Sequence, residues 1–413
     1  MGGTGVGGGL AAGSGAVGGA GTGVGSGAVG GAGTGVGSGA VGGAGTGVGP
    51  APGANLPALR SHNAALVLDL LRTAGKAGIS RIELAERTGL TPQAVSKIVG
   101  RLREEGLAAE AGRRASTGGK PRTVLRLLPS AGHAVGLHLD RDELTAVLLD
   151  LSGTRIATRT APLDLGAGAD AVLAGAAAEV WKLVAAAGGG GGPRVLGVGV
   201  AMPGPLDHST GVPHRVTGFP EWDGYPLRDA LATRLRLPVV LDKDTNAAAL
   251  GLALRGPGDS FAYLHLGTGL GAGLVLGGEL YRGARTGAGE FGHQVVQLDG
   301  PVCDCGNRGC IEALCLAAVA RGDIAGAARV LGVGAANLVE LLDIDRVLLG
   351  GRVVAAVEED FVRGVAAVLA VRSRVPVATA GGGTHAVAEG AAQLVLAPVF
   401  GRARAAFAAD RGE

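Results

Sequence analysis

The residues best suited to chemistry in this 413-residue sequence are three cysteines and a histidine that lie within eighteen positions. One imidazole and three thiolates are a ligand set typical of zinc, and four protein ligands complete a tetrahedron without leaving a position for a substrate. We therefore expect a structural zinc site. The alternative is a set of buried free cysteines beside a surface histidine. The predicted ligands are His293, Cys303, Cys305 and Cys310, while Cys315 is expected in the core.

A second candidate site is a basic segment in the N-terminal part of the chain. Residues 55–128 hold 13 Lys and Arg against 6 Asp and Glu, a net charge of +7, whereas the whole chain has a net charge of +2. Because the residues before this segment carry no charge, the remainder of the chain carries a net charge of −5. A basic module on an acidic body is typical of a DNA-binding module joined to a sensor or an enzyme.

The helix signals within this segment predict a helix-turn-helix. A first helix precedes the pair Ser80 and Glu83, which has the spacing of a capping box and begins a short second helix that ends near Gly89. Thr91 is a suitable N-cap for a third helix, with Pro92 at its first position. The third helix thus begins about three residues after the second ends, as in a helix-turn-helix whose last helix reads the major groove.

The predicted third helix has a polar face opposite its apolar stripe. Gln can pair with adenine, and Lys or Arg with guanine or phosphate. Two strand-like runs then flank a basic turn at 113–122, which predicts a wing whose cations contact phosphates or a minor groove. The alternative is an ordinary three-helix bundle with a solvated polar face. The predicted DNA-binding residues are Gln93, Ser96, Lys97 and Arg101 on the helix and Arg113, Arg114, Lys120 and Arg122 on the wing.

Beyond residue 130, apolar strand-like runs alternate with Ala-rich helical stretches. The predicted strands are AVGLHLD, ELTAVLLDL, RVLGVGVAM, PVVLDKD, FAYLHLGTG and AGLVLGGEL, and the predicted helices are DAVLAGAAAEVWKLVAA and YPLRDALATRL. This alternation predicts an α/β body. We expect three parts: a tail at 1–54, a winged helix-turn-helix domain at 55–129, and an α/β domain with the zinc site at 130–413.

The tail differs in composition from the rest of the chain. Residues 1–50 contain 25 of the 80 glycines, and the unit GSGAVGGAGTGV occurs three times between Gly13 and Val48. A segment with so few apolar side chains cannot offset the conformational entropy that ordering would cost. We therefore expect a disordered tail. Its irregular glycine spacing excludes collagen, and its sequence resembles neither a signal peptide nor a Leu-rich membrane span. We expect a cytoplasmic protein with no membrane partner.

After residue 58 the sequence resembles the ROK family, named for repressors, open reading frames and sugar kinases. The most specific match runs from GEFGH to CDCGNRGC, and VAMPGPLD, DTNAAALG, HLGTGLGAGL and VLLGG match further family motifs in the same order. With the basic domain in front, the chain most resembles the transcriptional-regulator branch, similar to the xylose and N-acetylglucosamine repressors. The resemblance implies an actin-like, sugar-kinase-type body of two α/β lobes, and a homo-oligomer, either dimer or tetramer.

The resemblance also implies a site for a sugar or sugar derivative, because carboxylates and an imidazole suit vicinal hydroxyls. His293 would place one ring nitrogen on zinc and the other toward the ligand. Lys243 replaces the family's usual Asn. Its cation either displaces a neutral sugar and selects a phosphorylated or acidic one, or it points to solvent or pairs with Asp242. The predicted effector-binding residues are Gly204, Lys243, Asp244, Glu290, His293 and Glu312.

In kinases of this family, Asp244 would be the base that deprotonates the attacking hydroxyl. The family's first phosphate loop, Asp-x-Gly-Gly-Thr, aligns with HLDRD at 138–142, which lacks the glycines that let backbone amides approach a phosphate. Asp140 and Asp142 would face a polyphosphate without compensation, although the second loop, 267–269, is intact. We expect a sugar-responsive repressor without kinase activity. The alternatives are an active sugar kinase that carries the DNA-binding domain, and a zinc-dependent DNA-binding protein with no ligand.

Overall fold

The computed structural model of the protein describes most of residues 56–402. Outside the described residues lie 1–55, 117–118, 188–193, 215, 217, 257–258 and 403–413, together with the side chains of 56–61, 114–116 and 119–121. The predicted tail and the side chains of Arg114 and Lys120 are therefore outside the described part of the chain.

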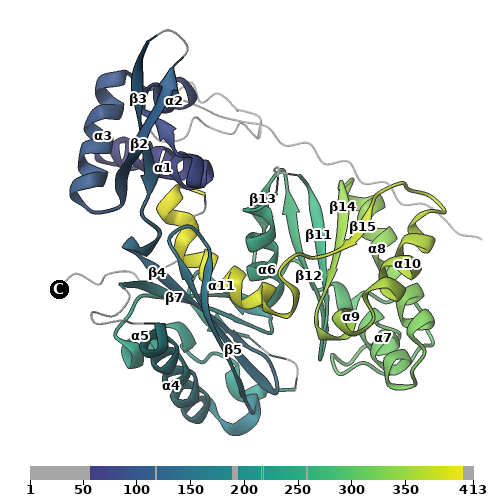
Figure 1. Ribbon diagram of the computed structural model, residues 1–413. Helices are drawn as coiled ribbons and strands as arrows, with labels where there is room; N and C mark the ends of the chain where they lie inside the picture. The colour runs from purple at the N-terminus through teal and green to yellow at the C-terminus, as the bar shows by residue number, and fades with distance from the viewer. Residues whose placement is uncertain are drawn as a thin grey trace, which may run out of the picture. The chain divides into compact units, whose positions relative to one another are not determined.

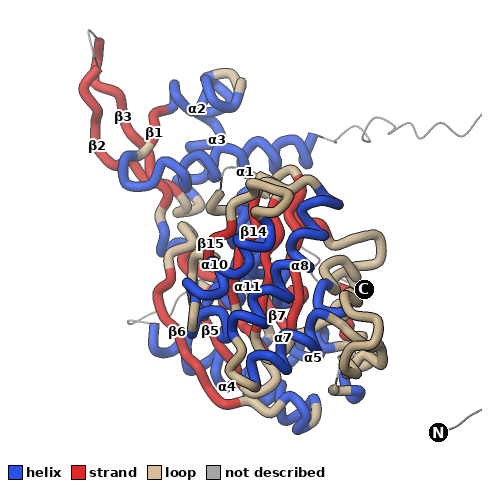
Figure 2. Tube along the Cα trace, turned by 90° about the vertical axis from the view of Figure 1, so that its right-hand side faces the viewer, coloured by secondary structure: helices blue, strands red, loops and turns tan. Residues whose placement is uncertain are grey.

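The described N-terminal region, which we call the head (56–127), combines helices with a small antiparallel sheet in which β3 lies between β1 and β2 (Figure 1). Its elements are α1 (Leu56–Ala74), η1 (Gly75–Ala77), β1 (Ile79–Ser80), α2 (Arg81–Thr88), α3 (Pro92–Glu104), β2 (Ala108–Ser116) and β3 (Gly119–Leu127). The β2–β3 hairpin extends away from the helices as the predicted wing (Figure 2). Its strands are longer than expected. Arg113 pairs with Thr123 and Arg114 with Arg122, because two register shifts let pairing continue through the predicted turn.

The helix boundaries in the head follow the capping signals. The Ser80 hydroxyl accepts a hydrogen bond from the Glu83 N–H (3.3 Å), and the Glu83 carboxylate accepts one from the Ser80 N–H (2.8 Å). The Thr91 hydroxyl caps α3 by accepting a hydrogen bond from the Ala94 N–H at 3.2 Å. Gly89 ends α2 with a φ of 68°, a conformation that glycine adopts without strain. The predicted helix-turn-helix is confirmed.

The first lobe of the body has a sheet with strand order β10-β7-β4-β5-β6. β10, β7 and β4 run parallel, and β5 and β6 continue the sheet antiparallel. Its elements are η2 (Pro129–Ala131), β4 (His133–Leu139), β5 (Glu143–Asp150), β6 (Arg155–Pro162), η3 (Leu165–Ala167), α4 (Ala169–Ala187), β7 (Val195–Met202), β8 (Leu206–Asp207), β9 (Val212–Pro213), η4 (Pro220–Trp222), α5 (Leu227–Leu235) and β10 (Val239–Lys243). Apolar side chains from α4, α5 and one face of the sheet form a buried core.

The second lobe repeats this arrangement with strand order β13-β12-β11-β14-β15. A meander of antiparallel strands is again followed by parallel ones. Its elements are α6 (Asp244–Ala253), β11 (Phe261–Leu266), β12 (Leu270–Leu276), β13 (Glu279–Tyr281), η5 (Phe291–His293), α7 (Ile311–Ala320), α8 (Ile324–Leu342), β14 (Arg346–Gly350), α9 (Arg352–Ala356), α10 (Glu358–Leu369) and β15 (Val377–Thr379). Two lobes of one topology confirm the predicted two-lobed α/β body.

Two helices, α6 and α11 (Ala386–Leu396), pack against each other between the two sheets (Figure 1). α6 lies on β12, and α11 lies on β4 and β7. The approach is too close for side chains at some positions. A Cβ on Gly390 of α11 would lie 1.9 Å from the Ala247 carbonyl oxygen of α6, and one on Gly136 of β4 would lie 1.9 Å from the Ala388 carbonyl oxygen. The lobes therefore meet backbone against backbone.

The end of α11 continues to the head. After α11, the short helix η7 (Ala397–Phe400) brings Phe400 under the guanidinium of Arg72 in α1, 5.2 Å from the ring centroid. Arg402 and Arg72 both pair with the Asp69 carboxylate, at 3.0 and 2.7 Å. An apolar and an ionic contact thus join the first helix of the head to the last described helix of the body.

The strands of the body differ from the expected ones in places, and the short strands β8, β9 and β15 were not expected. The run AGLVLGGEL is a hairpin, because Gly277 and Gly278, with φ of 59° and 79°, turn the chain between β12 and β13. β6 was not expected. Its residues alternate between exposed and half-buried positions at the sheet edge, so it lacks the apolar run of the other strands.

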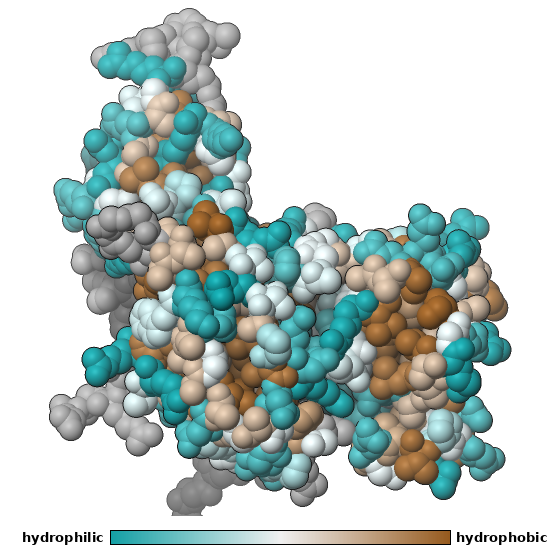
Figure 3. Space-filling view, turned by 60° about the horizontal axis from the view of Figure 1, so that its bottom comes forward, coloured by the Kyte–Doolittle hydropathy of each residue, from teal (hydrophilic) through white to brown (hydrophobic). Residues whose placement is uncertain are grey.

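The second lobe has apolar side chains on its surface, and Figure 3 shows hydrophobic residues gathered over it. Leu341 at the end of α8 and Val371 after α10 are each 79% exposed. A Glu340–Arg372 ion pair at 3.2 Å holds these two helix ends together. Among the described helices, α8 is also the one long and apolar enough to cross a membrane, and half of its apolar window is buried in the protein. It packs against α7 and α10, as a core helix does.

Candidate functional site

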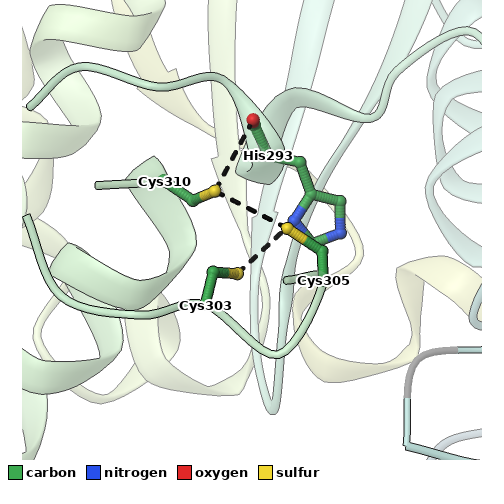
Figure 4. A group of neighbouring side chains, drawn as sticks. All are labelled: His293, Cys303, Cys305 and Cys310. Atoms are coloured by element: carbon green, nitrogen blue, oxygen red, sulfur yellow. Dashed lines mark hydrogen bonds between the residues drawn. The ribbon is translucent and has the colours of Figure 1, made fainter. Parts of the chain in front are cut away.

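Four side chains in the second lobe form a cluster that could hold a metal ion (Figure 4). The ligand atoms of His293, Cys303, Cys305 and Cys310 all lie within 4.8 Å of one another. Cys303 Sγ is 3.7 Å from His293 Nδ1, and Cys305 Sγ is 3.7 Å from Cys310 Sγ. In a zinc tetrahedron with Zn–S bonds of about 2.3 Å, neighbouring ligand atoms lie about 3.8 Å apart. The donor set and its spacing therefore fit zinc.

The backbone around the cluster is fixed by local contacts. The Cys303 N–H donates to the Asn307 carbonyl oxygen at 2.8 Å, which curls the chain between the first and last cysteine of the cluster. Gly309 has a φ of 68°, and a Cβ there would lie 1.5 Å from the Gln297 carbonyl oxygen. Cys310 follows directly as the N-cap of α7. The glycine thus permits the close crossing that places this cysteine opposite the others.

The protein environment raises the pKa of one thiol of the cluster and lowers that of another. Burial and, to a smaller extent, the neighbouring thiols raise the pKa of Cys310 to about 12. Burial also opposes ionisation of Cys305, but hydrogen bonds from the Asn307 N–H and the other thiols lower its pKa. A divalent cation at the centre favours the thiolate form. Cys315, predicted in the core, is fully buried and donates to the Ala327 carbonyl oxygen at 3.6 Å.

A pocket lies between the two lobes beside this cluster. The first lobe contributes residues from the ends of β4, β7 and β10, and the second lobe contributes the β11–β12 turn and the start of α7. His293 belongs to both the pocket and the metal cluster. All six predicted effector residues line this pocket: Gly204, Lys243, Asp244, Glu290, His293 and Glu312.

Asp244 is the first residue of α6 and lines the pocket. Its carboxylate accepts a hydrogen bond from the Thr245 N–H at 2.6 Å. Burial raises the pKa of Asp244 to about 7, against the opposing charge of Lys243, and the nearby carboxylates of Asp140 and Glu290 add to the rise. Near neutral pH the group is therefore divided between its two forms, so it can either donate to or accept from a hydroxyl.

Lys243 does not point to solvent or pair with Asp242, so that interpretation is wrong. It is buried, and its Nζ donates to the Ala288 carbonyl oxygen at 2.7 Å and pairs with Glu290 at 3.2 Å. Asp242 pairs instead with Arg282. The carboxylate of Glu290, on the facing loop, offsets the cost of burying the ammonium group.

Two further predicted residues shape the pocket. Glu312, buried at the start of α7, accepts a hydrogen bond from the Leu270 N–H at 2.7 Å, and its other oxygen lies 4.0 Å from Cys303 Sγ. It therefore connects the pocket to the metal cluster. Gly204 leaves room for the lysine, because a Cβ there would lie 2.8 Å from Lys243 Cδ.

The segments that align with the two phosphate loops are joined to each other across the lobes. Asp140 accepts a hydrogen bond from the Thr268 hydroxyl at 2.9 Å. Arg352, at the start of α9, pairs with Asp142 at 2.7 Å and with Asp140 at 3.4 Å. The expectation that these carboxylates lack compensation is wrong, because the compensating arginine lies 210 positions from Asp142 in the sequence. We call Asp140, Asp142, Thr268 and Arg352 the clasp.

Sequence reasoning also missed a histidine pair beside the clasp. His265 lines the pocket, and its Nδ1 lies 2.9 Å from the Tyr263 hydroxyl. Burial lowers the pKa of His265 to about 4, so the ring is neutral at physiological pH. His138 packs edge-on to it, with ring centroids 6.4 Å apart. The only sequence signal was a histidine at the end of each of two apolar strands, which is too common to indicate a site.

The predicted DNA-reading side chains of α3 face away from its buried stripe of Val95, Val99 and Leu102. Arg101 also pairs with Glu105 one turn later, at 3.3 Å. The polar face is therefore free to contact another molecule. The predicted DNA-binding residues that are exposed are Gln93, Ser96, Lys97, Arg101, Arg113 and Arg122.

Similarity to known proteins shows which domains this chain contains. Residues 67–108 match the winged helix-turn-helix DNA-binding profile, and residues 135–320 match the ROK family profile. The same fold occurs in a ROK family transcriptional regulator that is a homologue of the Escherichia coli MLC protein. It is 24% identical, with a TM-score of 0.67, over 83% of this chain and 98% of that one. The protein is thus a winged helix-turn-helix domain on an actin-like, two-lobed body.

The ROK hexokinase of Thermus thermophilus is 30% identical, with a TM-score of 0.52, over 63% of this chain and 96% of the hexokinase. The chain therefore belongs to the ROK family, as its motifs predict. The xylose repressor of Bacillus subtilis (strain 168) is 30% identical over 237 residues, which are 57% of this chain and 61% of the repressor. The chain thus spans about three fifths of the length of that curated relative.

Proposed function

We propose that this protein is a DNA-binding transcriptional repressor whose affinity for its operator responds to a sugar or sugar derivative. One observation carries the proposal: a winged helix-turn-helix with an exposed polar α3 face is joined, in one compact unit, to a body with a polar pocket between its lobes. The similarity to the Bacillus subtilis xylose repressor supports the same function.

The head would bind duplex DNA with α3 in the major groove. Gln93 and Lys97 are placed to contact base edges, and Arg101 lies on the flank of the same face. Arg113 and Arg122 on the wing would contact phosphates beyond the groove. Because residues 55–128 carry a net charge of +7, most of the affinity would come from phosphate contacts and would fall steeply with salt.

The pocket would bind the sugar hydroxyls through fixed acceptors and donors. Asp244 and Glu312 each accept a hydrogen bond from a backbone N–H, so their orientation is set before a ligand arrives. His293 Nδ1 faces the cysteine cluster, which leaves Nε2 as the ring nitrogen available to the ligand. Zinc bound by the cluster would be structural, because four protein ligands fill its coordination sphere, and it would fix the ring of His293.

A continuous packing route connects the pocket to the head. Asp244 begins α6, α6 packs on α11 through backbone contacts at Gly390, and α11 continues into η7 beneath α1. A ligand that moves the lobes relative to each other would shift α11 against α6. The Phe400–Arg72 contact would then transmit the displacement to the head.

The clasp argues against phosphoryl transfer. Kinases of this architecture need backbone amides that approach the phosphates closely. Here Asp140 accepts a hydrogen bond from the Thr268 hydroxyl, and Arg352 pairs with both Asp140 and Asp142. A nucleotide would have to break these pairs and replace them. We propose that the protein is not an enzyme.

A second candidate function, an active sugar kinase with a DNA-binding head, is favoured by Asp244. It occupies the position of the catalytic base in the family, and the chain is similar to a ROK hexokinase. A coupled ADP-release assay with hexoses, pentoses and amino sugars separates the two functions. Turnover at rates typical of kinases, lost in Asp244→Ala, would replace the repressor proposal with this one.

The repressor proposal is tested by selecting, from a random library of DNA duplexes, those that the full, zinc-loaded chain binds. We expect one recovered motif, bound with an affinity that falls steeply with salt and is reduced by Lys97→Ala. A sugar panel added to the same complex should contain at least one compound that changes the affinity. Absence of duplex binding even at low salt would refute the proposal.

The predicted homo-oligomer stays a prediction. Leu341 and Val371 provide exposed apolar side chains on the second lobe, where a copy of the chain could bury them. Light scattering after size-exclusion chromatography would test this, since Leu341→Glu should lower the measured mass if the surface is used. An unchanged mass would place the interface elsewhere.

A further inference from the structure

The cysteines of the metal cluster differ in their exposure to solvent. Cys303 and Cys310 are buried, as is Cys315 outside the cluster, whereas Cys305 is exposed. Cys305 also lines a cavity on the protein surface together with His293. A small solute in water can therefore reach one sulfur of the cluster directly, and the other two are shielded by the protein.

A second thiol of the cluster lies next to the exposed one. Cys305 Sγ and Cys310 Sγ are 3.7 Å apart (Figure 4). A disulfide bond is about 2.05 Å long, so the two sulfurs would have to approach by about 1.7 Å to form one. The Cys303 thiol instead contacts His293 Nδ1 at 3.7 Å and Glu312 Oε1 at 4.0 Å. The geometry thus favours Cys310 as the partner of Cys305.

The chain around Cys305 has room for this movement. Cys305 lies in a turn that is closed by a hydrogen bond from the Gly306 N–H to the Cys303 carbonyl oxygen at 2.9 Å. A Cβ on Gly306 would meet no atom within 4 Å, so the turn faces open space. Cys310, in contrast, is the N-cap of α7 and forms a β-bridge with Val295. The sulfurs can therefore meet by a shift of the exposed turn, while α7 stays in place.

These features match the requirements for reversible thiol oxidation. Cysteines that react with peroxides combine thiolate character, exposure and a neighbouring thiol that can form a disulfide. The structure gives Cys305 the exposure and the neighbouring thiol. Zinc bound by the cluster would supply the thiolate character, because metal ligation requires the deprotonated form.

We propose that Cys305 and Cys310 form a site of reversible oxidation by peroxides. The Cys305 thiolate attacks one peroxide oxygen, the O–O bond breaks, and hydroxide leaves, which produces a sulfenic acid. The Cys310 thiolate then attacks that sulfur, so that the S–S bond forms, the S–O bond breaks, and a second hydroxide leaves. Two protons from the solvent convert both hydroxides to water. The two thiolates lose two electrons, and the peroxide gains them.

Oxidation at this site would act on the metal cluster and then on the pocket. A Cys305–Cys310 disulfide removes two of the four ligands, and His293 and Cys303 alone cannot complete a tetrahedron. His293 also lines the pocket between the lobes, so its ring would lose the contact that fixes it. The inference goes beyond the proposed function, because the oxidation requires neither DNA nor a sugar.

The test is treatment of the full, zinc-loaded chain with a few equivalents of hydrogen peroxide. Zinc release is followed with a chromophoric chelator, free thiols are counted in denaturant, and the disulfide is located by peptide mass spectrometry. We expect one zinc ion and two thiols to be lost per chain in parallel, with a Cys305–Cys310 disulfide as the product. Dithiothreitol and added zinc should reverse both losses. At limiting peroxide, dimedone should trap the sulfenic acid on Cys305.

Two variants separate the exposed thiol from the other cysteines. Cys305→His keeps a zinc ligand at this position but removes the exposed sulfur, so peroxide should release its zinc at least about tenfold more slowly. Cys315→Ala removes a buried thiol outside the cluster and should release zinc at the rate of the original chain. Amide hydrogen exchange in η5, which contains His293, should rise on oxidation in the original chain and in Cys315→Ala.

Three results would each overturn the proposal. They are first labelling of Cys303 or Cys310 by dimedone, a disulfide between any other pair of cysteines, and zinc release from Cys305→His as fast as from the original chain. If Cys305→His binds no zinc, the labelling and the disulfide mapping of the original chain decide. Failure here leaves the proposed function standing, because selection of DNA duplexes by the reduced, zinc-loaded chain does not depend on oxidation.

Discussion

The contact between α6 and α11 gives a sharp test, because one glycine decides how closely the helices approach. In Gly390→Ala, the new methyl group would lie 1.9 Å from the Ala247 carbonyl oxygen and 2.3 Å from the Ala247 carbonyl carbon. Both are backbone atoms in the middle of a helix, so neither can rotate away. The helices must separate, and the tightly packed strands beneath them limit that movement.

The change in the free energy of unfolding in Gly390→Ala is the sum of two opposing contributions. Overpacking a rigid core costs about 1–3 kcal/mol, and the backbone clash places this site at the upper end of that range. Replacing a glycine within a helix by alanine returns about 1 kcal/mol. We therefore expect a net loss of about 2 kcal/mol in the free energy of unfolding, together with a smaller effect of the ligand on DNA affinity.

Gly175→Ala is the matched control. Gly175 also lies within a helix, α4, but a Cβ there meets nothing within 4 Å. This variant keeps only the favourable helix term and should be about 0.5–1 kcal/mol more stable than the original chain. Urea denaturation of both variants measures the difference, about 3 kcal/mol in all. If Gly390→Ala is as stable as Gly175→Ala, α6 and α11 are not rigidly packed and the proposed route from pocket to head fails.

Three further predictions concern the candidate sites. Burial raises the pKa of Asp244 to about 7 in the folded protein, against 3.8 for an unperturbed aspartate, so the native state holds a proton that the unfolded chain releases, and its contribution to stability falls as pH rises between those values; Asp244→Asn should flatten this fall in urea midpoints at pH 5 and pH 8, and an unchanged slope would contradict it. Cys305→Ser should lower zinc content below one ion per chain by elemental analysis, whereas Cys315→Ala should not; equal zinc in both would reject the cluster as the metal site. Lys97→Ala should cost about 1–3 kcal/mol for the preferred operator only, whereas Arg113→Ala should weaken all duplexes similarly in anisotropy titrations; uniform loss in both would place base readout elsewhere.

The features that depend on neighbours in sequence were predictable. A capping box needs only Ser80 and Glu83 three positions apart, and its two hydrogen bonds form as expected. The metal cluster is similar, because His293 and Cys310 are separated by one compact loop. In both cases local geometry determines the contact, and the spacing of residue types reports that geometry directly.

The features that depend on the tertiary fold were not predictable from the sequence. Nothing near Asp142 in the sequence indicates that Arg352 will pair with it, since the start of α9 meets the β4–β5 turn only through the tertiary arrangement of the two lobes. The fate of Lys243 was equally hidden, because the partner that buries it, Glu290, comes from a loop of the other lobe. The charge balance of the pocket depends on residues from both lobes. A single sequence segment shows the residues of only one lobe.

The clasp also has an evolutionary consequence. Asp140 and Asp142 share one guanidinium, so loss of Arg352 leaves two carboxylates without an ion-pair partner, whereas loss of Asp142 leaves Asp140 and Arg352 as a matched pair. The three charged positions are therefore not equally replaceable. We expect Asp142 to tolerate neutral substitution during divergence, and Arg352 to change only after, or together with, the two carboxylates.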